Sequence, residues 1–128
     1  MAYYYSKTLR TEFDEAVFRV KQALKNEGFG ILTEIDVRDT LKKKLDVEFR
    51  NYRILGACNP PFAYKALQAE DKIGTMLPCN VVVQETLDGD IEIAAIDPVA
   101  SMQAIGNPDL REIADAIGQK LKNIIQNA

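Results

Sequence analysis

Two long stretches of the chain place apolar residues at the spacing of an α-helix. In residues 12–27 the apolar positions recur three and four apart, and Gly28 follows at a point that favours a helix end. From residue 107 to near the end of the chain the same spacing returns, through Ile117 and Ile124. The pattern predicts two long amphipathic helices, whose matching apolar faces bring Leu24, Ile117 and Ile124 into one core.

Five other stretches have the composition of β-strands. They are rich in Tyr, Val and Ile, and in the last of them Ile91 and Ile93 alternate with more polar or smaller residues. Asp88 and Gly89 form a strong hairpin-turn signal between the last two. The strands are expected at residues 2–9, 29–35, 51–57, 79–86 and 90–96.

Shorter helices are expected between these strands. Asp36 is placed to cap a helix over residues 37–45, where Lys42, Lys43 and Lys44 form a solvated charged face. Asn59 and a following proline are typical of the start of a helix that runs to about residue 71. Residues 73–78 are expected to be a connector, and residues 99–105 a short helical piece.

This order of elements predicts an α+β fold in a single domain over residues 1–128. We expect one mostly antiparallel sheet with the two long helices on one face and the short helices, or a partner, on the other. Val81, Val82 and Val83 make their strand apolar on both sides, so both faces should be covered. A homodimer with two-fold symmetry is therefore expected.

Composition narrows the possible functions. The chain has 128 residues, a net charge of −3, two cysteines and no histidine. Catalysis by Ser-His-Asp or Cys-His and imidazole metal ligands are excluded. The absence of a basic block argues against nucleic acid as a partner, and the short apolar runs argue against a membrane. No signal-peptide pattern begins the sequence, so we expect a cytoplasmic protein whose cysteines are not joined in a disulfide.

Cys58 and Cys79 together form the main candidate functional site. Each ends or begins a predicted strand, and each has a proline and an asparagine close by: Cys58 is followed by Asn59 and Pro60, and Cys79 lies between Pro78 and Asn80. The positive end of the helix expected after Cys58 stabilises a nearby thiolate. Three interpretations stay open: two inert buried cysteines, a thiol-based site for a ligand or metal, or a redox pair. The ligand-binding candidates are Cys58, Asn59, Cys79 and Asn80.

A metal at these thiols would need further ligands. Glu34 or Asp97 could add oxygen and complete a set that suits zinc, whereas Met76 could add a thioether and complete a set that suits copper(I). Zinc is preferred because carboxylates are more plentiful at the strand ends. The simpler interpretation is that Glu34 is a solvated strand residue and that Asp97 caps a turn.

Several segments of the sequence resemble a known family. These are residues 52–60 (YRILGACNP) and 73–83 (IGTMLPCNVVV), supported by Asp88-Gly89 and Asp97-Pro98. They resemble the cysteine-bearing branch of the family called domain of unknown function 302. The resemblance implies a small α+β domain similar to the TATA-binding-protein-like β-α-β(4)-α arrangement, with short extra helices. It implies no established activity, and a fold similar to that of a DNA-binding protein does not imply DNA binding.

These observations together predict a cytoplasmic small-ligand or metal-binding protein, or a sensor, with a dithiol site. One alternative is a thiol-dependent redox or sulfur-handling enzyme. The other is a homo-oligomeric interaction module with inert cysteines. Of the possible cofactors, zinc is expected before copper(I), and no catalytic residue is assigned.

Overall fold

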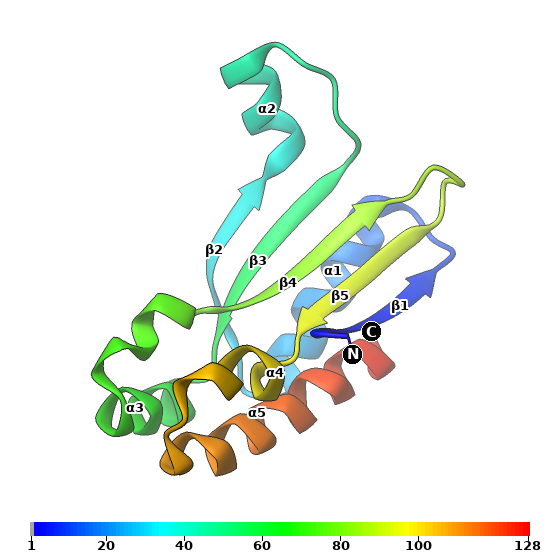
Figure 1. Cartoon of the computed structure of the whole chain (residues 1–128). Coiled ribbons are helices and arrows are strands. Elements are labelled where there is room, and N and C mark those ends of the chain that lie inside the picture. The colour runs from blue at the N-terminus through cyan, green and yellow to red at the C-terminus, as the bar shows by residue number, and fades with distance from the viewer. Residues whose placement is uncertain (1) are drawn as a thin grey trace.

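A five-stranded antiparallel sheet forms the centre of the computed structural model, which describes residues 2–128 (Figure 1). The strand order is β1-β5-β4-β3-β2, so the first strand lies beside the last. This arrangement confirms the predicted α+β fold with one antiparallel sheet. The strands are β1 (Tyr4–Leu9), β2 (Gly30–Asp36), β3 (Tyr52–Cys58), β4 (Cys79–Glu85) and β5 (Ile91–Ile96).

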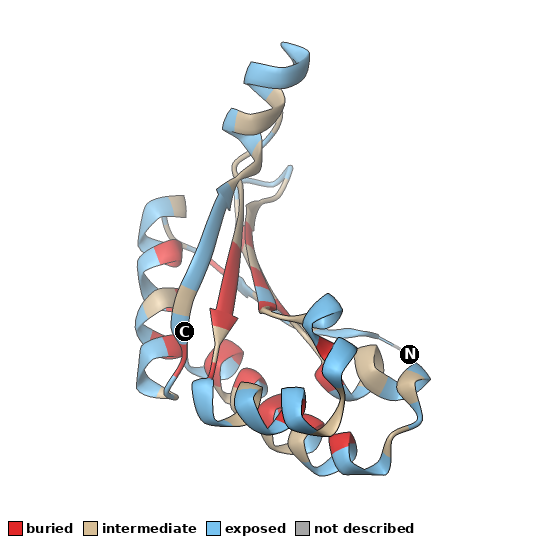
Figure 2. Ribbon diagram, turned by 90° about the vertical axis from the view of Figure 1, so that its left-hand side faces the viewer, coloured by how far each residue is buried: buried red, intermediate tan, exposed pale blue. Residues whose placement is uncertain are grey.

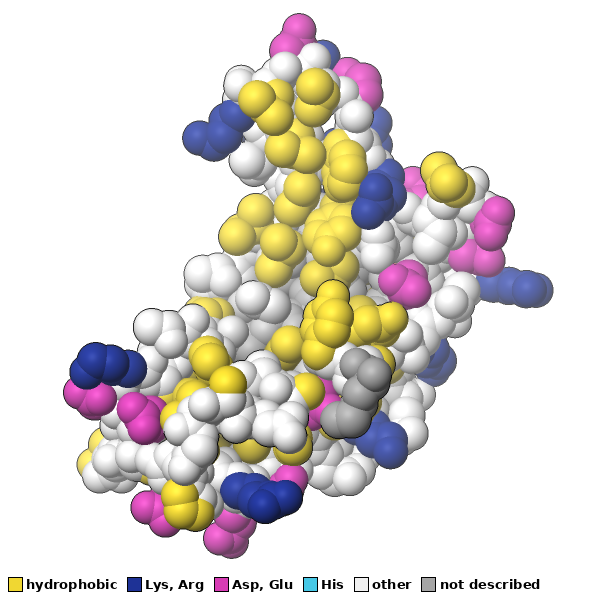
Figure 3. Space-filling view, viewed as in Figure 1, with side chains coloured by type: hydrophobic (Ala, Val, Ile, Leu, Met, Phe, Trp, Pro, Cys, Tyr) yellow, Lys and Arg dark blue, Asp and Glu magenta, His cyan; other side chains and the backbone are white. Residues whose placement is uncertain are grey.

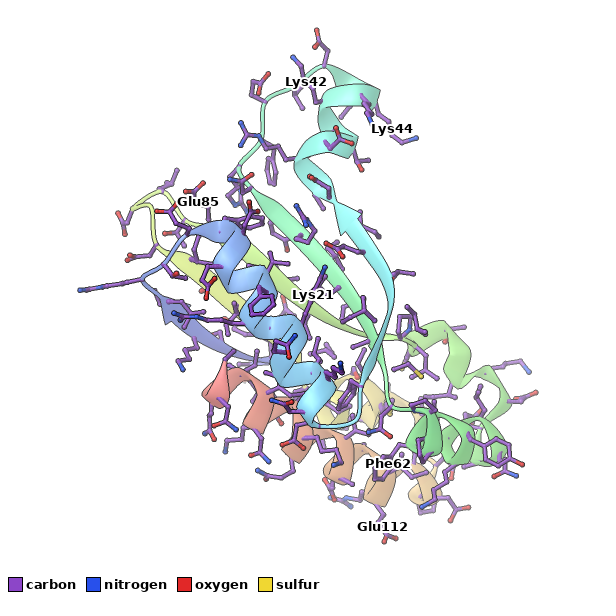
Figure 4. The ribbon with its side chains drawn as sticks, turned by 180° about the vertical axis from the view of Figure 1, so that it is seen from behind. Lys21, Lys42, Lys44, Phe62, Glu85 and Glu112 are labelled. Atoms are coloured by element: carbon purple, nitrogen blue, oxygen red, sulfur yellow. The ribbon has the colours of Figure 1, made fainter. Side chains whose placement is uncertain are left out.

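The two long helices, α1 (Phe13–Asn26) and α5 (Pro108–Asn127), cover one face of the sheet and contact each other. Figure 4, which views the molecule from behind, shows α1 lying in front of the sheet. The start of α5 is fixed by Asn107, whose side chain accepts a hydrogen bond from the Asp109 backbone N–H at 3.0 Å. The prediction of two long helices on one face is confirmed.

The main core lies between these helices and the covered face of the sheet, and Figure 2 colours buried residues red along these strands and helices. Leu24, Ile117 and Ile124 belong to this one core, as their helical spacing predicts. The strands contribute alternate residues to it, because successive side chains of a strand point to opposite faces. The strand residues that are fully buried there include Leu55, Val81, Val83, Ile91 and Ile93.

A second, smaller core lies beyond one end of the sheet. It joins α5 to α3 (Pro60–Ala69), η1 (Asp71–Met76), α4 (Pro98–Met102) and η2 (Gln103–Ile105). Residues 73–78 connect α3 to β4 as expected, but most of this connector belongs to η1, a 3₁₀ helix. Its regular turn points Ile73 inward, where that side chain is fully buried against Ala66 and Leu110.

The helix α2 (Val37–Leu45) lies at the opposite end of the sheet and projects from it with the ends of β2 and β3 (Figures 1 and 2). We call residues 37–51 the arm. Asp36 caps α2 as predicted, accepting a hydrogen bond from the Asp39 N–H at 2.9 Å. The expectation that the short helices cover the second face is wrong, because α2 and the α3–α4 group lie at its two ends. Val82, on that face, is only half-buried, whereas Val81 and Val83 are buried on the other.

Candidate functional site

A cavity of about 330 Å³ lies where β3 ends and β4 begins, between α3 and α5. Its wall is mostly hydrophobic, with Phe29 from just before β2, Phe62 from α3 and Ile117 from α5. Figure 4 labels Phe62 on α3. Both cysteines line this cavity, so the fold brings to one place two thiols that are 21 positions apart.

The strand register explains how the cysteines reach the cavity. Cys79 pairs with Ala57, and Cys58 pairs with Gly30 on the other side of β3. Alternation along β3 therefore directs Cys58 and Cys79 toward opposite faces of the sheet. They share a cavity because it lies at the end of both strands. Cys79 is buried, with 7% of its surface exposed, and Cys58 is half-buried.

Burial dominates the electrostatics of Cys79. It raises the pKa of the Cys79 thiol from its ordinary value of 9.0 to about 11, and the negative charge that Cys58 can carry adds a smaller contribution in the same direction. Cys79 is consequently a neutral thiol at pH 7. A neutral thiol is a weak hydrogen-bond donor and not a nucleophile.

The two candidate asparagines occupy different places. Asn59 is buried and lines the cavity, at the N-cap position of α3. The expectation that its side chain caps α3 is wrong, since that amide donates to the Glu27 carbonyl oxygen at 3.4 Å and ties α3 to the end of α1. Asn80 is exposed and lies opposite Gly56 on the uncovered face of the sheet, away from Cys79.

The carboxylates expected to complete a zinc site are engaged elsewhere. Glu34 Oε1 lies 2.7 Å from Lys21 Nζ, and its Oε2 lies 2.7 Å from Arg53 Nη1. Hydrogen bonding from Lys21, ahead of that from Arg53, lowers the pKa of Glu34. Asp97 accepts a hydrogen bond from the Val99 N–H at 3.0 Å and caps α4. Across residues 2–128 the structure gathers no three Cys, Asp or Glu side chains able to hold a metal ion, so the Cys-Cys-carboxylate set is not assembled.

Comparison with known proteins places the chain in a family. Residues 5–128 match the sequence profile of the family described as Domain of unknown function DUF302. The chain belongs to the DUF302 family. Its fold is similar to the crystal structure of uncharacterized conserved protein DUF302 from Bacillus stearothermophilus, at a TM-score of 0.92 and 30% sequence identity, over 99% of this chain and 98% of that one. A search of curated proteins found no match.

Membership in DUF302 confirms the resemblance but assigns no activity, so the chemistry has to be argued from the cavity itself. Each helix in the described part of this DUF302 chain is too short or too polar to cross a membrane. The wall of the cavity is apolar and contains sulfur atoms, and these two properties define the ligands that the site can bind.

Sequence reasoning missed one sulfur at the cavity of this DUF302 protein. Met76, the expected thioether, lies in η1 with 38% of its surface exposed, whereas Met102 of α4 lines the cavity. Met102 is 23 positions beyond Cys79 in a five-residue helix, and no local pattern distinguishes it. Only the packing of α4 against α5 brings it to the cavity.

Alkylation of Cys79 provides a test of its state. In a Cys58→Ser variant Cys79 is the only thiol, and burial, the larger cause of its raised pKa, remains. Its reaction with iodoacetamide at pH 8 should be slower in the folded protein than in urea by a factor of up to about a hundred, because the full shift from 9.0 to about 11 reduces the thiolate fraction about a hundredfold and burial causes the larger part of that shift. The folded-state rate should rise with pH toward pH 11. Equal rates at pH 8 in buffer and in urea would show instead that Cys79 is an accessible thiol.

Proposed function

We propose that this DUF302 protein binds a small, largely apolar molecule in the cavity lined by Cys58 and Cys79. The observation that supports this most is a single hydrophobic cavity of about 330 Å³ whose wall contains both thiols. That volume falls in the range of small-molecule sites, about 300–1,000 Å³, which are lined mainly by apolar side chains with a few polar groups. The polar groups here are the two thiols and the Asn59 amide.

The protonated thiol of Cys79 favours ligand binding over thiol catalysis as the function of this site. A redox or sulfur-transferring pair needs a thiolate to attack and a second thiol within reach. An ordinary thiol, with a pKa of 9.0, is already protonated at neutral pH, and burial takes Cys79 further from the thiolate form, so it supplies neither a ready nucleophile nor a good leaving group. We propose that the protein acts in a reducing compartment such as the cytoplasm, where two free thiols persist.

A straight-chain alcohol of suitable size tests the cavity. ¹⁵N-labelled protein is titrated with 1-octanol, and amide chemical shifts are followed by two-dimensional NMR. We expect saturable chemical-shift changes at Cys58, Cys79 and the residues of α3 and α5 that line the cavity. The alkyl chain of octanol should displace water from the apolar wall. In an Ala63→Leu variant, which adds bulk to the wall, binding should be about tenfold weaker or lost.

A matched control separates cavity filling from a general effect of leucine. Ala104 lies exposed in η2, so an Ala104→Leu variant adds the same bulk to the surface and should bind octanol like the natural chain. Shifts confined to the uncovered sheet face, or equal affinity in both variants, would overturn the proposal.

Copper(I) is a second candidate occupant, favoured by the three sulfur-bearing side chains, Cys58, Cys79 and Met102, that line one cavity. Thiolate and thioether ligands select this soft ion. The same spectra recorded with copper(I) in place of octanol distinguish the two occupants. Copper(I) as the occupant requires stoichiometric binding that is lost in Cys58→Ser, and binding must weaken as pH falls because the ion displaces thiol protons.

A further inference from the structure

The uncovered face of the sheet carries an apolar row that crosses four strands in register. Ile35 of β2 pairs with Ile54 of β3, Ile54 pairs with Val82 of β4, and Val82 pairs with Ala94 of β5. Ile35 is 45% exposed, and the other three are half-buried. Because cross-strand partners lie side by side on one face, these side chains form a continuous strip.

The strip continues in both directions across this face. Tyr4 of β1, which pairs with Ile96 two positions beyond Ala94, lies on the same face and is 43% exposed. Figure 3 shows the hydrophobic surface running from the arm across the middle of the sheet. An exposed apolar surface of this continuity, bounded by polar residues, is typical of an interaction site.

The arm lacks a hydrophobic core of its own. The nine residues of α2, all within the described chain, include no buried side chain. Leu45 at its end is 65% exposed, and Val47 just beyond it is also exposed. An isolated helix of this length is marginally stable in water, since most helical stability comes from packing an apolar face. The arm therefore gains little stability from apolar packing within the chain.

Charge favours a second copy of this chain as the cover. The arm carries five basic residues (Arg38, Lys42, Lys43, Lys44, Arg50) against three acidic ones, although the whole chain has a net charge of −3. The remainder of the molecule is therefore acidic. An isologous dimer uses the same patch on both copies, so an arm that lies against the partner brings a segment of net positive charge to a body of net negative charge.

We infer that two copies pack through this face about a two-fold axis, with the apolar strips in contact and the arm of each copy against its partner. This arrangement covers the second face of the sheet, buries the exposed apolar side chains of the arm and pairs opposite charges twice. It uses a surface separate from the thiol-lined cavity, so it stands independently of the proposed ligand.

Analytical ultracentrifugation tests the inference. At about 20 μM the natural chain should sediment as a dimer of 14.3 kDa subunits. Ile35→Lys places a charge in the strip of each copy and should weaken the dimer at least about a hundredfold, because unpaired charges are costly to bury. The matched control is Phe18→Lys, at a 57% exposed position of α1 on the opposite side of the sheet, which should remain dimeric. Circular dichroism establishes that both variants are folded.

Charge reversal tests the arm separately. Lys44→Glu should weaken the dimer at low salt, with the difference shrinking as the salt concentration rises toward 1 M, because salt screens surface charges. A natural chain that is monomeric at 100 μM would overturn the inference and leave this face to a different partner. Equal dissociation of the Ile35→Lys and Phe18→Lys variants would also overturn it, as would a dimer unaffected by Lys44→Glu at every salt concentration.

Discussion

Replacing Leu24 by alanine should lower the free energy of unfolding by about 3–5 kcal/mol. Leu24 lies near the end of α1 and has no exposed surface, in the core that α1, α5 and the sheet share. Truncation removes three buried carbon atoms and leaves a space that the surrounding helix and strands cannot fully close. Urea denaturation followed by circular dichroism measures the loss as a lower midpoint at an unchanged slope.

Phe18 provides the control in the same helix. Phe18→Ala removes a larger side chain, but one that is 57% exposed, and alanine favours a helix. Its effect should therefore stay within about 0.5–1 kcal/mol. Similar losses for Leu24→Ala and Phe18→Ala would mean that α1 is not docked on the sheet as the structure describes.

Both long helices were predictable because the pattern that indicates a helix lies within a short stretch of sequence. A helix repeats every 3.6 residues, so a buried face is visible as a spacing within a few turns. Caps that use a neighbouring residue are equally local, and Asp36, Asp97 and Asn107 all accept hydrogen bonds from N–H groups two or three positions ahead. Asn59 differs because its amide finds a carbonyl group 32 positions away, at Glu27. No spacing in the sequence indicates that contact.

The candidate site was predictable in part for the same reason. Cys58 ends one strand and Cys79 begins the next, and consecutive antiparallel strands bring such ends together. The expected metal ligands were chosen by chemistry without knowledge of their competing partners. Glu34 is held by Lys21 and Arg53, from α1 and β3, and these ion pairs depend on tertiary packing. The sequence also could not show that the short helices gather at the two ends of the sheet.

The role of Gly56 could not be predicted from the sequence, because the reason for a glycine inside a strand depends on which atoms pack against it. It is buried in β3, and a Cβ atom added there would collide with Thr33 Oγ1 and lie 2.8 Å from Pro78 Cγ. Thr33 can rotate, but the ring of Pro78 is rigid and joins η1 to β4. The close approach of Pro78 to the strand therefore requires glycine at this position.

Gly56→Ala should therefore lower the free energy of unfolding by about 3 kcal/mol, the upper part of the range for overpacking a buried site. Gly30 in the neighbouring strand is the matched control, since an added Cβ there meets no described atom within 4 Å. Gly30→Ala should be neutral or stabilising by less than about 1 kcal/mol, because alanine restricts the unfolded chain. Urea midpoints of the two variants give the comparison, and equal midpoints would contradict the close packing of Pro78 on β3. Because Pro78 precedes Cys79 in the cavity wall, Gly56→Ala should also shift the Cys79 amide resonance, whereas Gly30→Ala should leave it in place.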